Sequence, residues 1–578
     1  MPRIHVALDL EFTGLDPERD EIIEIGMVRF KGDEVLETYS SLVKASKPIP
    51  YKIQQLSGIS QAEVDRAPLL DTLRGKILAF VRNYPVVGHS VEMDLRFLHR
   101  QGLLLNNLSI DTFELATILM PGLKRYSLSS LADHLKIEVT KSHRALPDAM
   151  ASKDLFLALV ERAERWDLSL LEELARLAEQ SDWPLLRVFR DIIAERQESQ
   201  RAAIQSGRPP EPARLQLMPR ATADIPPLEP TETITPIDVD ELAAMISPGG
   251  PFERLFPGYE HRPQQVEMLR GVGEAMNLPT HLLVEAGTGI GKSVAYILPA
   301  AYFAVKNGRR VVISSATINL QDQLYTKDIP DIQRIVPLPF NVALLKGRGN
   351  YICMRRLSIF RRARQLSTDE ARVLAKVFAW LPVTKTGDRA ELLLINNEFK
   401  VWSQIQATSE TCMGDLCPFR QRGQCFFYRA RARAERVHLL IVNHALLLSD
   451  LALENRILPE YDYLIIDEAH HLEEQATHQF GLEVGRQDIH LFLNGLSHQR
   501  SGAPGGLLAT VPALFQREGM SASARQAMTS TIERIGAQIG AAQQYLNALL
   551  DLLTSFLAEH GDAERGRAGG QQRYAKNI

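Results

Sequence analysis

The chain has 578 residues, which is too long for one ordinary hydrophobic core, so several domains are expected. Its net charge of −4 excludes a polycation, so any contact with nucleic acid must come from local basic patches. An apolar fraction of 45% with no run of membrane-spanning length excludes a membrane protein, and without a signal peptide we expect a cytoplasmic one.

The N-terminal part predicts strands followed by helices. Residues 4–30 predict two strands separated by the polar turn GLDPERD, and a helical pattern follows over 128–135. Another helical stretch covers 168–195. We therefore assign residues 1–165 to a first domain and residues 166–200 to a helical extension.

The composition changes over residues 201–257, which are rich in proline and lack apolar periodicity. We interpret this stretch as an extended linker, with one short helix over 239–246. Beyond it the apolar runs HLLVEA, RRVVISSA and DYLIID alternate with helical patterns, which predicts a parallel sheet. After residue 482 the chain is predicted to be helical again and to end in a polar tail.

Two acids in the first predicted strand form a candidate metal site. Asp9 and Glu11 are two residues apart, so both carboxylates point to the same face of a sheet. Carboxylates held this close repel each other unless a cation lies between them, which indicates Mg²⁺ or Mn²⁺. On its own such a pair is more often part of a solvated strand face.

Further residues of matching chemistry follow in two motifs. GHSVEMDLRFL places Asp94 at the start of a helix, and HRALPDAM places His143 five residues before Asp148. A lone histidine is more often structural, but the HxAxxDA arrangement argues against that interpretation.

Over about the first 165 residues these motifs resemble the DEDDh exonucleases, which include the proofreading epsilon subunit of bacterial DNA polymerase III. The resemblance implies that His143 is the general base of a 3′–5′ exonuclease. Arg144 stands where the related tyrosine class would carry its tyrosine, which favours the histidine class. The resemblance also implies an RNase H-like domain whose ligands for two Mg²⁺ or Mn²⁺ ions are Asp9, Glu11, Asp94 and Asp148.

A glycine-rich run, EAGTGIGKS, lies between HLLVEA and an apolar helical pattern. Such a turn points backbone N–H groups at phosphates. Lys292 is expected to reach the β- and γ-phosphates of ATP, and Ser293 to hold its Mg²⁺. Ala286 replaces the first glycine of the strict pattern. The other expected nucleotide contacts are Gly287, Thr288, Gly289 and Gly291.

Two acids close the run YLIID. We expect Asp467 to complete the Mg²⁺ site of ATP and Glu468 to orient the attacking water. Gln265, within YEHRPQQ, stands where helicases read adenine.

All four cysteines lie between these two ATP motifs, at Cys353, Cys412, Cys417 and Cys425. Four thiolates suit either zinc or a 4Fe–4S cluster, and the close C-x2-C pairs typical of zinc ribbons are absent from the sequence. Arginines are interleaved with aromatic residues in FRQRGQCFFYRARARAER, which for the run as a whole favours contact with DNA phosphates and bases over a solvated basic helix with its aromatics in the core.

Residues 259–478 resemble the DinG branch of the XPD-like helicases, which implies a 4Fe–4S cluster, with zinc as the lesser alternative, and 5′→3′ translocation on single-stranded DNA. The domains implied are a RecA-like lobe over 258–350 and 438–480, a cluster insertion over 351–437, and an incomplete helical arch over 481–578.

The QxxGRxxR stretch of a second motor lobe does not follow Glu468. The sequence is therefore either a fragment, or half of a motor completed by another chain, or a protein that uses ATP only as a switch. We predict a 3′–5′ exonuclease fused to an ATP-dependent helicase in DNA repair or replication, acting on DNA that is single-stranded or has a free 3′ end, with RNA–DNA hybrids as a further candidate. The alternatives are a nuclease whose ATP-binding and cluster regions only dock it on DNA, and a zinc-stabilised nuclease.

Overall fold

The computed structural model divides the chain into two compact units, Met1–Ala469 and His470–Ile578. No helix among the described residues has both the length and the apolar character needed to cross a membrane. The predicted polar tail, residues 561–578, lies outside the described residues. The described residues are 3–138, 143–179, 181, 183–205, 225–256, 258–287, 289–362, 366–453, 457–481, 485–500, 503–515 and 521–560.

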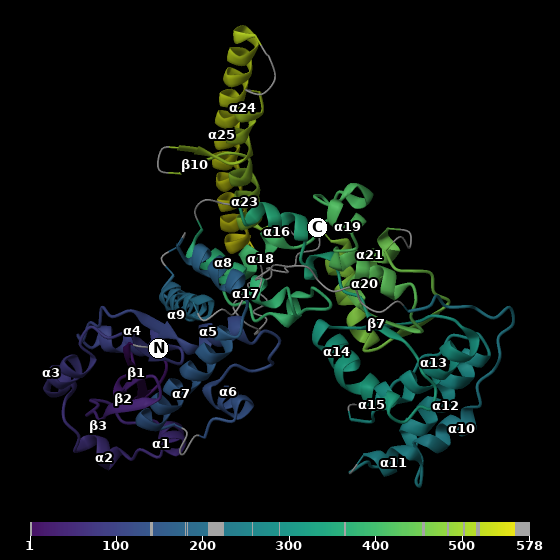
Figure 1. The fold of residues 1–578 in the computed structure, drawn as a ribbon. Coiled ribbons are helices and arrows are strands. Elements are labelled where there is room, and N and C mark those ends of the chain that lie inside the picture. Colours follow the sequence, from purple (N-terminus) through teal and green to yellow (C-terminus); the bar gives the residue numbers. More distant parts are fainter. Residues whose placement is uncertain are drawn as a thin grey trace. The chain divides into compact units, whose positions relative to one another are not determined.

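A five-stranded sheet of order β3-β2-β1-β4-β5 forms the N-terminal region (Figure 1). The pairs β1–β2 and β2–β3 are antiparallel, whereas the pairs β1–β4 and β4–β5 are parallel. The two predicted strands are confirmed as β1 and β2, whereas β3 is an edge strand whose mostly exposed residues show no apolar alternation. The strands are β1 (Ile4–Phe12), β2 (Ile22–Lys31), β3 (Glu34–Leu42), β4 (Val86–Gly88) and β5 (Ser109–Asp111).

Helices cover both faces of this sheet. Ala7 and Val28 belong to a core shared with α5 and α7, while Leu8 and Met27 pack with α3 and α4 on the opposite face. The predicted helix over 128–135 is confirmed as α6, and the predicted helical extension consists of α8 and α9. The helices are α1 (Tyr51–Ser57), α2 (Gln61–Asp65), α3 (Leu70–Val81), α4 (Val91–Arg100), α5 (Thr112–Leu119), α6 (Leu128–Leu135), α7 (Ala145–Glu164), α8 (Leu168–Glu179) and α9 (Leu186–Gln205).

A second, four-stranded sheet of order β7-β8-β6-β9 is entirely parallel. Two of the three predicted strands, RRVVISSA and DYLIID, are confirmed as β6 and β9. The strands are β6 (Val311–Ser315), β7 (Val342–Leu344), β8 (Leu439–Asn443) and β9 (Tyr463–Ile466), and the flanking helices include α12 (Pro263–Asn277), α13 (Lys292–Asn307), α14 (Ile318–Gln323), α15 (Ile329–Gln333) and α21 (His444–Ala452).

The prediction of a buried strand at HLLVEA, residues 281–286, is wrong. These residues have no strand structure, and the Leu283 side chain is 94% exposed. A strand needs a neighbouring backbone to pair with, and among the described residues the edge strand β9 pairs only with β6. An apolar run alone does not supply that partner, so the sequence pattern could not distinguish the two cases.

The predicted extended linker is also wrong in its second half, because residues 225–256 pack onto the second sheet region. Thr235 N–H donates to Asn307 Oδ1 at 2.7 Å, and Ile237 is buried beside α12 and α13. The short helix expected over 239–246 is confirmed as α10 (Val239–Met245), and α11 (Pro251–Leu255) follows it.

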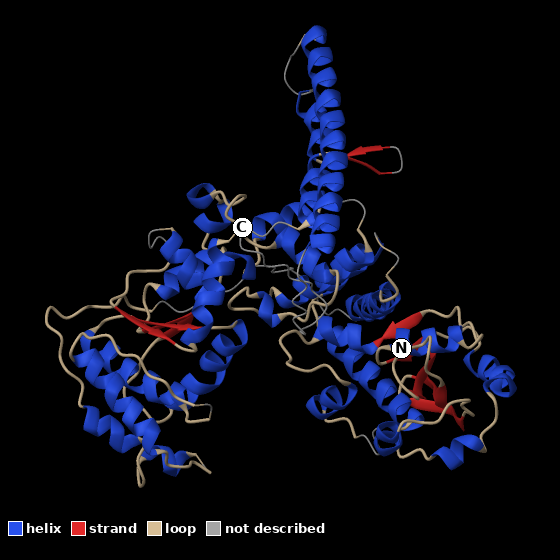
Figure 2. Ribbon diagram, turned by 180° about the vertical axis from the view of Figure 1, so that it is seen from behind, coloured by secondary structure: helices blue, strands red, loops and turns tan. Residues whose placement is uncertain are grey.

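Figure 2 shows the strands gathered in separate sheets that are flanked by helices. Short helices occupy the insertion between β7 and β8. The insertion contains α16 (Met354–Phe360), α17 (Thr368–Trp380), α18 (Glu398–Ile405), α19 (Pro418–Gln421) and α20 (Phe426–Ala434). The second unit is helical, as predicted, apart from one small hairpin: α22 (Leu472–Phe480), α23 (Arg486–Leu496), β10 (His498–Arg500), β11 (Ala503–Gly505), α24 (Leu507–Phe515) and α25 (Ala522–His560).

Candidate active site of the N-terminal region

The two acids of β1 lie on the sheet face that α7 covers. Asp9 and Glu11 share the alternation of Ala7, which contacts the α7 core, because side chains two apart on a strand point the same way. Helix α7 packs against both β1 and β2 and carries Asp148 in its first turn. The sheet and this helix therefore bring acids from opposite ends of the domain together.

Asp94 reaches the same place from α4. Its side chain is 5% exposed and hydrogen-bonds to the backbone of Leu10, between the two acids of β1. The helix begins after Ser90, whose left-handed backbone (φ +63°) is held by Asp111: the Ser90 N–H donates to Asp111 Oδ1 at 2.9 Å.

His143 stands immediately before α7, with a left-handed backbone (φ +64°). Its backbone N–H donates to Asp148 Oδ2 at 3.0 Å, so the histidine and the acid are fixed to each other. One potential ligand atom from each of Glu11, His143 and Asp148 lies within 4.8 Å of the others, which is the spacing of a metal site.

The electrostatics link all four acids. Burial raises the pKa of Asp9 well above its usual value, and the charges of Asp94, Asp148 and Glu11 raise it further. Burial, followed by the charge of Asp148, raises the pKa of Glu11 to about 7. The four carboxylates cannot all be ionised at neutral pH without a compensating cation. The structure thus brings the five predicted residues together, and their catalytic roles stay predictions.

The sequence analysis missed one acid of this neighbourhood. Glu24 on β2 is directly opposite Glu11 in the β1–β2 register and is 2% exposed. It forms an ion pair with Arg144 at 2.7 Å. A charged residue inside the otherwise apolar run IIEIGMV was the available signal.

The glycine-rich loop also meets the acids predicted to act with it. Gly289 and Gly291 both have φ +83°, a conformation that favours glycine. Lys292 Nζ lies 2.7 Å from Glu468 Oε1, which follows the strand β9. Tyr296 on α13 donates to Asp467 Oδ2 at 3.1 Å. Ser293 is at the start of α13, whereas Thr288 lies outside the described residues.

Gln265 contacts the loop rather than open space. Its side chain is 4% exposed, and its amide Nε2 donates to the Gly291 carbonyl at 2.8 Å. The hydroxyl of Tyr259 donates to its Oε1 at 3.1 Å. In this structure Gln265 therefore braces the glycine-rich loop, and adenine recognition by it stays a prediction.

The four cysteines all lie in the described part of the insertion, but no three of their sulfur atoms lie within 4.8 Å of one another. Cys353, Cys417 and Cys425 each directly precede a helix, and Cys412 is exposed in a loop. Burial raises the pKa of the Cys425 thiol, and the other three thiols act on it in the same direction. A metal centre shared by the four thiols therefore stays a prediction.

The arginine-rich run is only partly available for DNA. Phe426 and Phe427 are 1% and 6% exposed, so both belong to the core rather than to a base-stacking surface. Tyr428 instead stacks with Arg420, whose guanidinium carbon lies 3.8 Å from the ring centre. For these two phenylalanines the alternative interpretation, aromatics in the core, is therefore the correct one.

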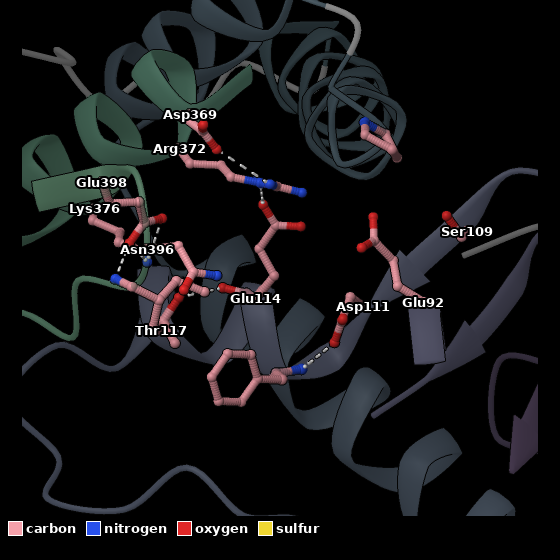
Figure 3. Close-up of a pocket in the computed structure, with 13 residues that line it drawn as sticks. Glu92, Ser109, Asp111, Glu114, Thr117, Asp369, Arg372, Lys376, Asn396 and Glu398 are labelled. Carbon is pink, nitrogen blue, oxygen red and sulfur yellow. Dashed lines mark hydrogen bonds and ion pairs between the residues drawn. The ribbon is translucent and has the colours of Figure 1, made fainter. Parts of the chain in front are cut away.

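A separate polar cavity of about 180 Å³ lies beside α5 and α17 (Figure 3). Glu114 points towards Arg372 and forms an ion pair with it, and it also accepts from the Trp183 indole N–H at 2.8 Å. Lys376 and Glu398 form a buried ion pair at 2.7 Å. The principal charged side chains that line this cavity thus pair with one another.

Comparisons with known proteins agree with the geometry. The exonuclease family model RNase_T matches residues 6–156. The chain is similar to the "3'-5' exonuclease DinG" of Bacillus subtilis (strain 168), with 30% identity over 529 residues that cover 89% of this chain and 54% of that protein. The protein of the same name from Staphylococcus aureus (strain USA300) is 28% identical over 492 residues, 84% of this chain and 52% of that protein.

The chain thus spans about half the length of the curated relatives it matches. Among solved structures it is similar to "Exonuclease X in complex with 5' overhanging duplex DNA", with 25% identity and a TM-score of 0.24, over 27% of this chain and 90% of that one.

Proposed function

We propose that the chain removes nucleotides from the 3′ end of DNA through an N-terminal DEDDh exonuclease domain, because it is similar to the DinG 3′–5′ exonucleases and its residues 6–156 match an exonuclease family model. The observation that carries the proposal is the convergence of Glu11, His143 and Asp148, with potential ligand atoms within 4.8 Å of one another. An RNase H-like arrangement of the sheet would then serve to bring these groups together.

The carboxylates fit a pair of divalent cations. Oxygen donors suit Mg²⁺ and Mn²⁺, and burial, followed by the neighbouring carboxylates, raises the pKa values of Asp9 and Glu11, so bound cations would stabilise their ionised forms. When bound, the ions would lower the pKa of water and stabilise charge on the departing oxygen. The residues that would hold them are Asp9, Glu11, Asp94 and Asp148.

His143 would take the proton of the attacking water. The imidazole is exposed beside the acids, and a neutral imidazole nitrogen accepts a proton, which suits a general base. The water oxygen bonds to phosphorus, and the bond between phosphorus and the 3′-oxygen of the penultimate nucleotide breaks. A nucleoside 5′-monophosphate leaves, and the departing oxygen takes a proton from solvent.

Changing His143 to alanine tests this proposal. We expect the rate of release of 3′-terminal nucleotides from a labelled oligonucleotide to fall by about 10²- to 10⁴-fold, since a general base contributes about that much. DNA binding, measured by fluorescence anisotropy, should stay within about twofold because the imidazole is not needed for it. His134→Ala, at an exposed position on α6, is the matched control. A fully active His143→Ala variant would refute the assignment.

We further propose that the second sheet region is a RecA-like lobe that binds Mg-ATP and belongs to an iron–sulfur helicase with 5′→3′ polarity. The left-handed glycines of the loop and the contact between Lys292 and Glu468 support nucleotide binding. The rival proposal is that this lobe only docks the nuclease on DNA or acts as a switch. Single-stranded DNA that stimulates ATP hydrolysis would favour the motor, and a folded protein without such turnover would favour docking.

Lys292→Ala should weaken ATP binding by about 10- to 100-fold, because it removes charge-assisted contacts with the phosphates. Equilibrium dialysis measures this affinity, and the nuclease rate of the same variant should stay within about twofold of wild type. Lys306→Ala, on the same helix but bonded to the Pro236 carbonyl, is the control. Unchanged ATP affinity in Lys292→Ala would exclude the loop as the nucleotide site.

A further inference from the structure

Glu24 is a buried acid beside the proposed metal site, and it is not one of the four proposed ligands. It is a fifth acid beside four that already repel one another, and its charge adds to the raised pKa values of Asp9 and Glu11. It lies opposite Glu11 across the β1–β2 pair, where cross-strand side chains are neighbours. A buried carboxylate in such a place needs a specific partner.

Both oxygens of Glu24 are engaged by the segment that leads into α7. Arg144 donates from Nη2 to Oε1 at 2.7 Å and from Nε to Oε2 at 3.0 Å, the paired geometry of an arginine fork. The backbone N–H of Ala145 donates to Oε2 at 3.0 Å. Because both carboxylate oxygens accept these hydrogen bonds, Glu24 binds the segment before α7 and does not act as a ligand for a cation.

The segment that Glu24 holds contains the reacting groups. His143 has a left-handed backbone, which is unfavourable for a residue with a Cβ and persists only when neighbouring contacts enforce it. Asp148 accepts from the His143 N–H. The start of α7 also lies directly on β2, since a Cβ at Gly26 would be 2.2 Å from the Ala145 carbonyl carbon.

We propose that Glu24 and Arg144 are positioning residues for the nuclease reaction. Their ion pair fixes the turn before α7, so that the His143 imidazole and the Asp148 carboxylate stand opposite Glu11. The inference rests on the proposed metal-dependent function of that site. Loss of the pair lets the strained turn relax, and a displacement of about 1 Å at a reacting group costs on the order of 10²-fold in rate.

The test uses Glu24→Gln and Arg144→Lys in the full chain. Each variant should lower kcat on a single-stranded oligonucleotide by about 10- to 100-fold and leave KM within about twofold, because the turn acts on chemistry and not on DNA binding. The Mn²⁺ concentration for half-maximal rate should rise. In Arg144→Ala, added methylguanidinium should restore part of kcat, which a general folding defect would not allow.

A second ion pair on the same sheet provides the control. Glu37→Gln breaks the 2.6 Å pair between Glu37 and Arg29, which joins β2 to β3, and kcat should stay within about twofold. Should Glu24→Gln fail to fold, Arg144→Lys decides, because the Arg144 side chain is 37% exposed.

Wild-type kcat and metal dependence in a folded Arg144→Lys variant would overturn the positioning role, as would a rise in KM alone. The proposed function would still stand in that case if His143→Ala were inactive. Full activity of His143→Ala would instead refute the proposed function itself.

Discussion

Replacing Asp9 with asparagine should lower the exonuclease rate by about 10³-fold or more. Asp9 is half-buried among the other acids, and removing its charge takes a ligand from the cations proposed to activate water and stabilise the departing oxygen. Such stabilisation is worth several kcal/mol, and each 1.36 kcal/mol is tenfold in rate. Release of 3′-terminal nucleotides with Mg²⁺ and with Mn²⁺ measures the effect.

The same variant should be more stable than wild type when metal is removed. Burial and neighbouring charges raise the pKa of Glu11 to about 7, above its unfolded value of about 4.3. The folded protein therefore binds protons more tightly, and its stability falls as the pH rises from about 4.3 through 7. The pKa of Asp9 is also raised well above its usual value, first by burial and then by the charges of Asp94, Asp148 and Glu11. Asparagine does not titrate, so this part of the loss is absent from Asp9→Asn, and thermal unfolding in EDTA should show a higher Tm for the variant at pH 8.

Asp33→Asn, at an exposed acid in the turn between β2 and β3, is the control and should change neither activity nor the pH dependence of Tm. Retained exonuclease activity in Asp9→Asn would show that the acids on β1 do not hold the catalytic cations. Lost activity together with a lower Tm at pH 8 would instead mean that Asp9 supports the fold.

The sequence was most informative where the spacing of neighbouring residues along a single strand or helix determines where their side chains lie. The spacing of Asp9 and Glu11 places both on one face of β1, because side chains alternate along a strand. Helix α6 has the predicted bounds, since Ser127 caps its N-terminus and apolar residues recur at helical spacing. The placement of His143 beside Asp148 follows in the same way from their proximity in the chain.

Contacts between distant residues could not be predicted in this way. Glu24 and Arg144 are 120 residues apart, and one sequence gives no sign that they meet. The packing of residues 225–256 depends on Asn307, far along the chain. The wrong prediction of a strand at 281–286 has the same cause. An apolar run indicates a tendency to form a strand, but it does not show whether a neighbouring strand is within reach.

Cys417→Ser should remove most of the iron from the chain. Cys417 is 9% exposed, and after burial the thiols of Cys353, Cys412 and Cys417 all raise the pKa of the Cys425 thiol. If the four hold the proposed 4Fe–4S cluster, the wild-type protein purified without oxygen should contain about four iron atoms per chain. Loss of one buried thiolate should lower this to less than about one, measured by elemental analysis and visible absorption.

The cluster variant should also change the insertion locally, because a bound metal centre contributes folding free energy to the segment that holds it. Limited proteolysis should cut Cys417→Ser within residues 351–437 faster than wild type, while 3′-nucleotide release persists because the nuclease acids lie in the N-terminal region. Ser409→Ala, exposed in the loop that leads to Cys412, should keep its iron. About one zinc and no iron in the wild-type protein would replace the cluster with a zinc centre. Full iron content in Cys417→Ser would show that Cys417 is not a ligand.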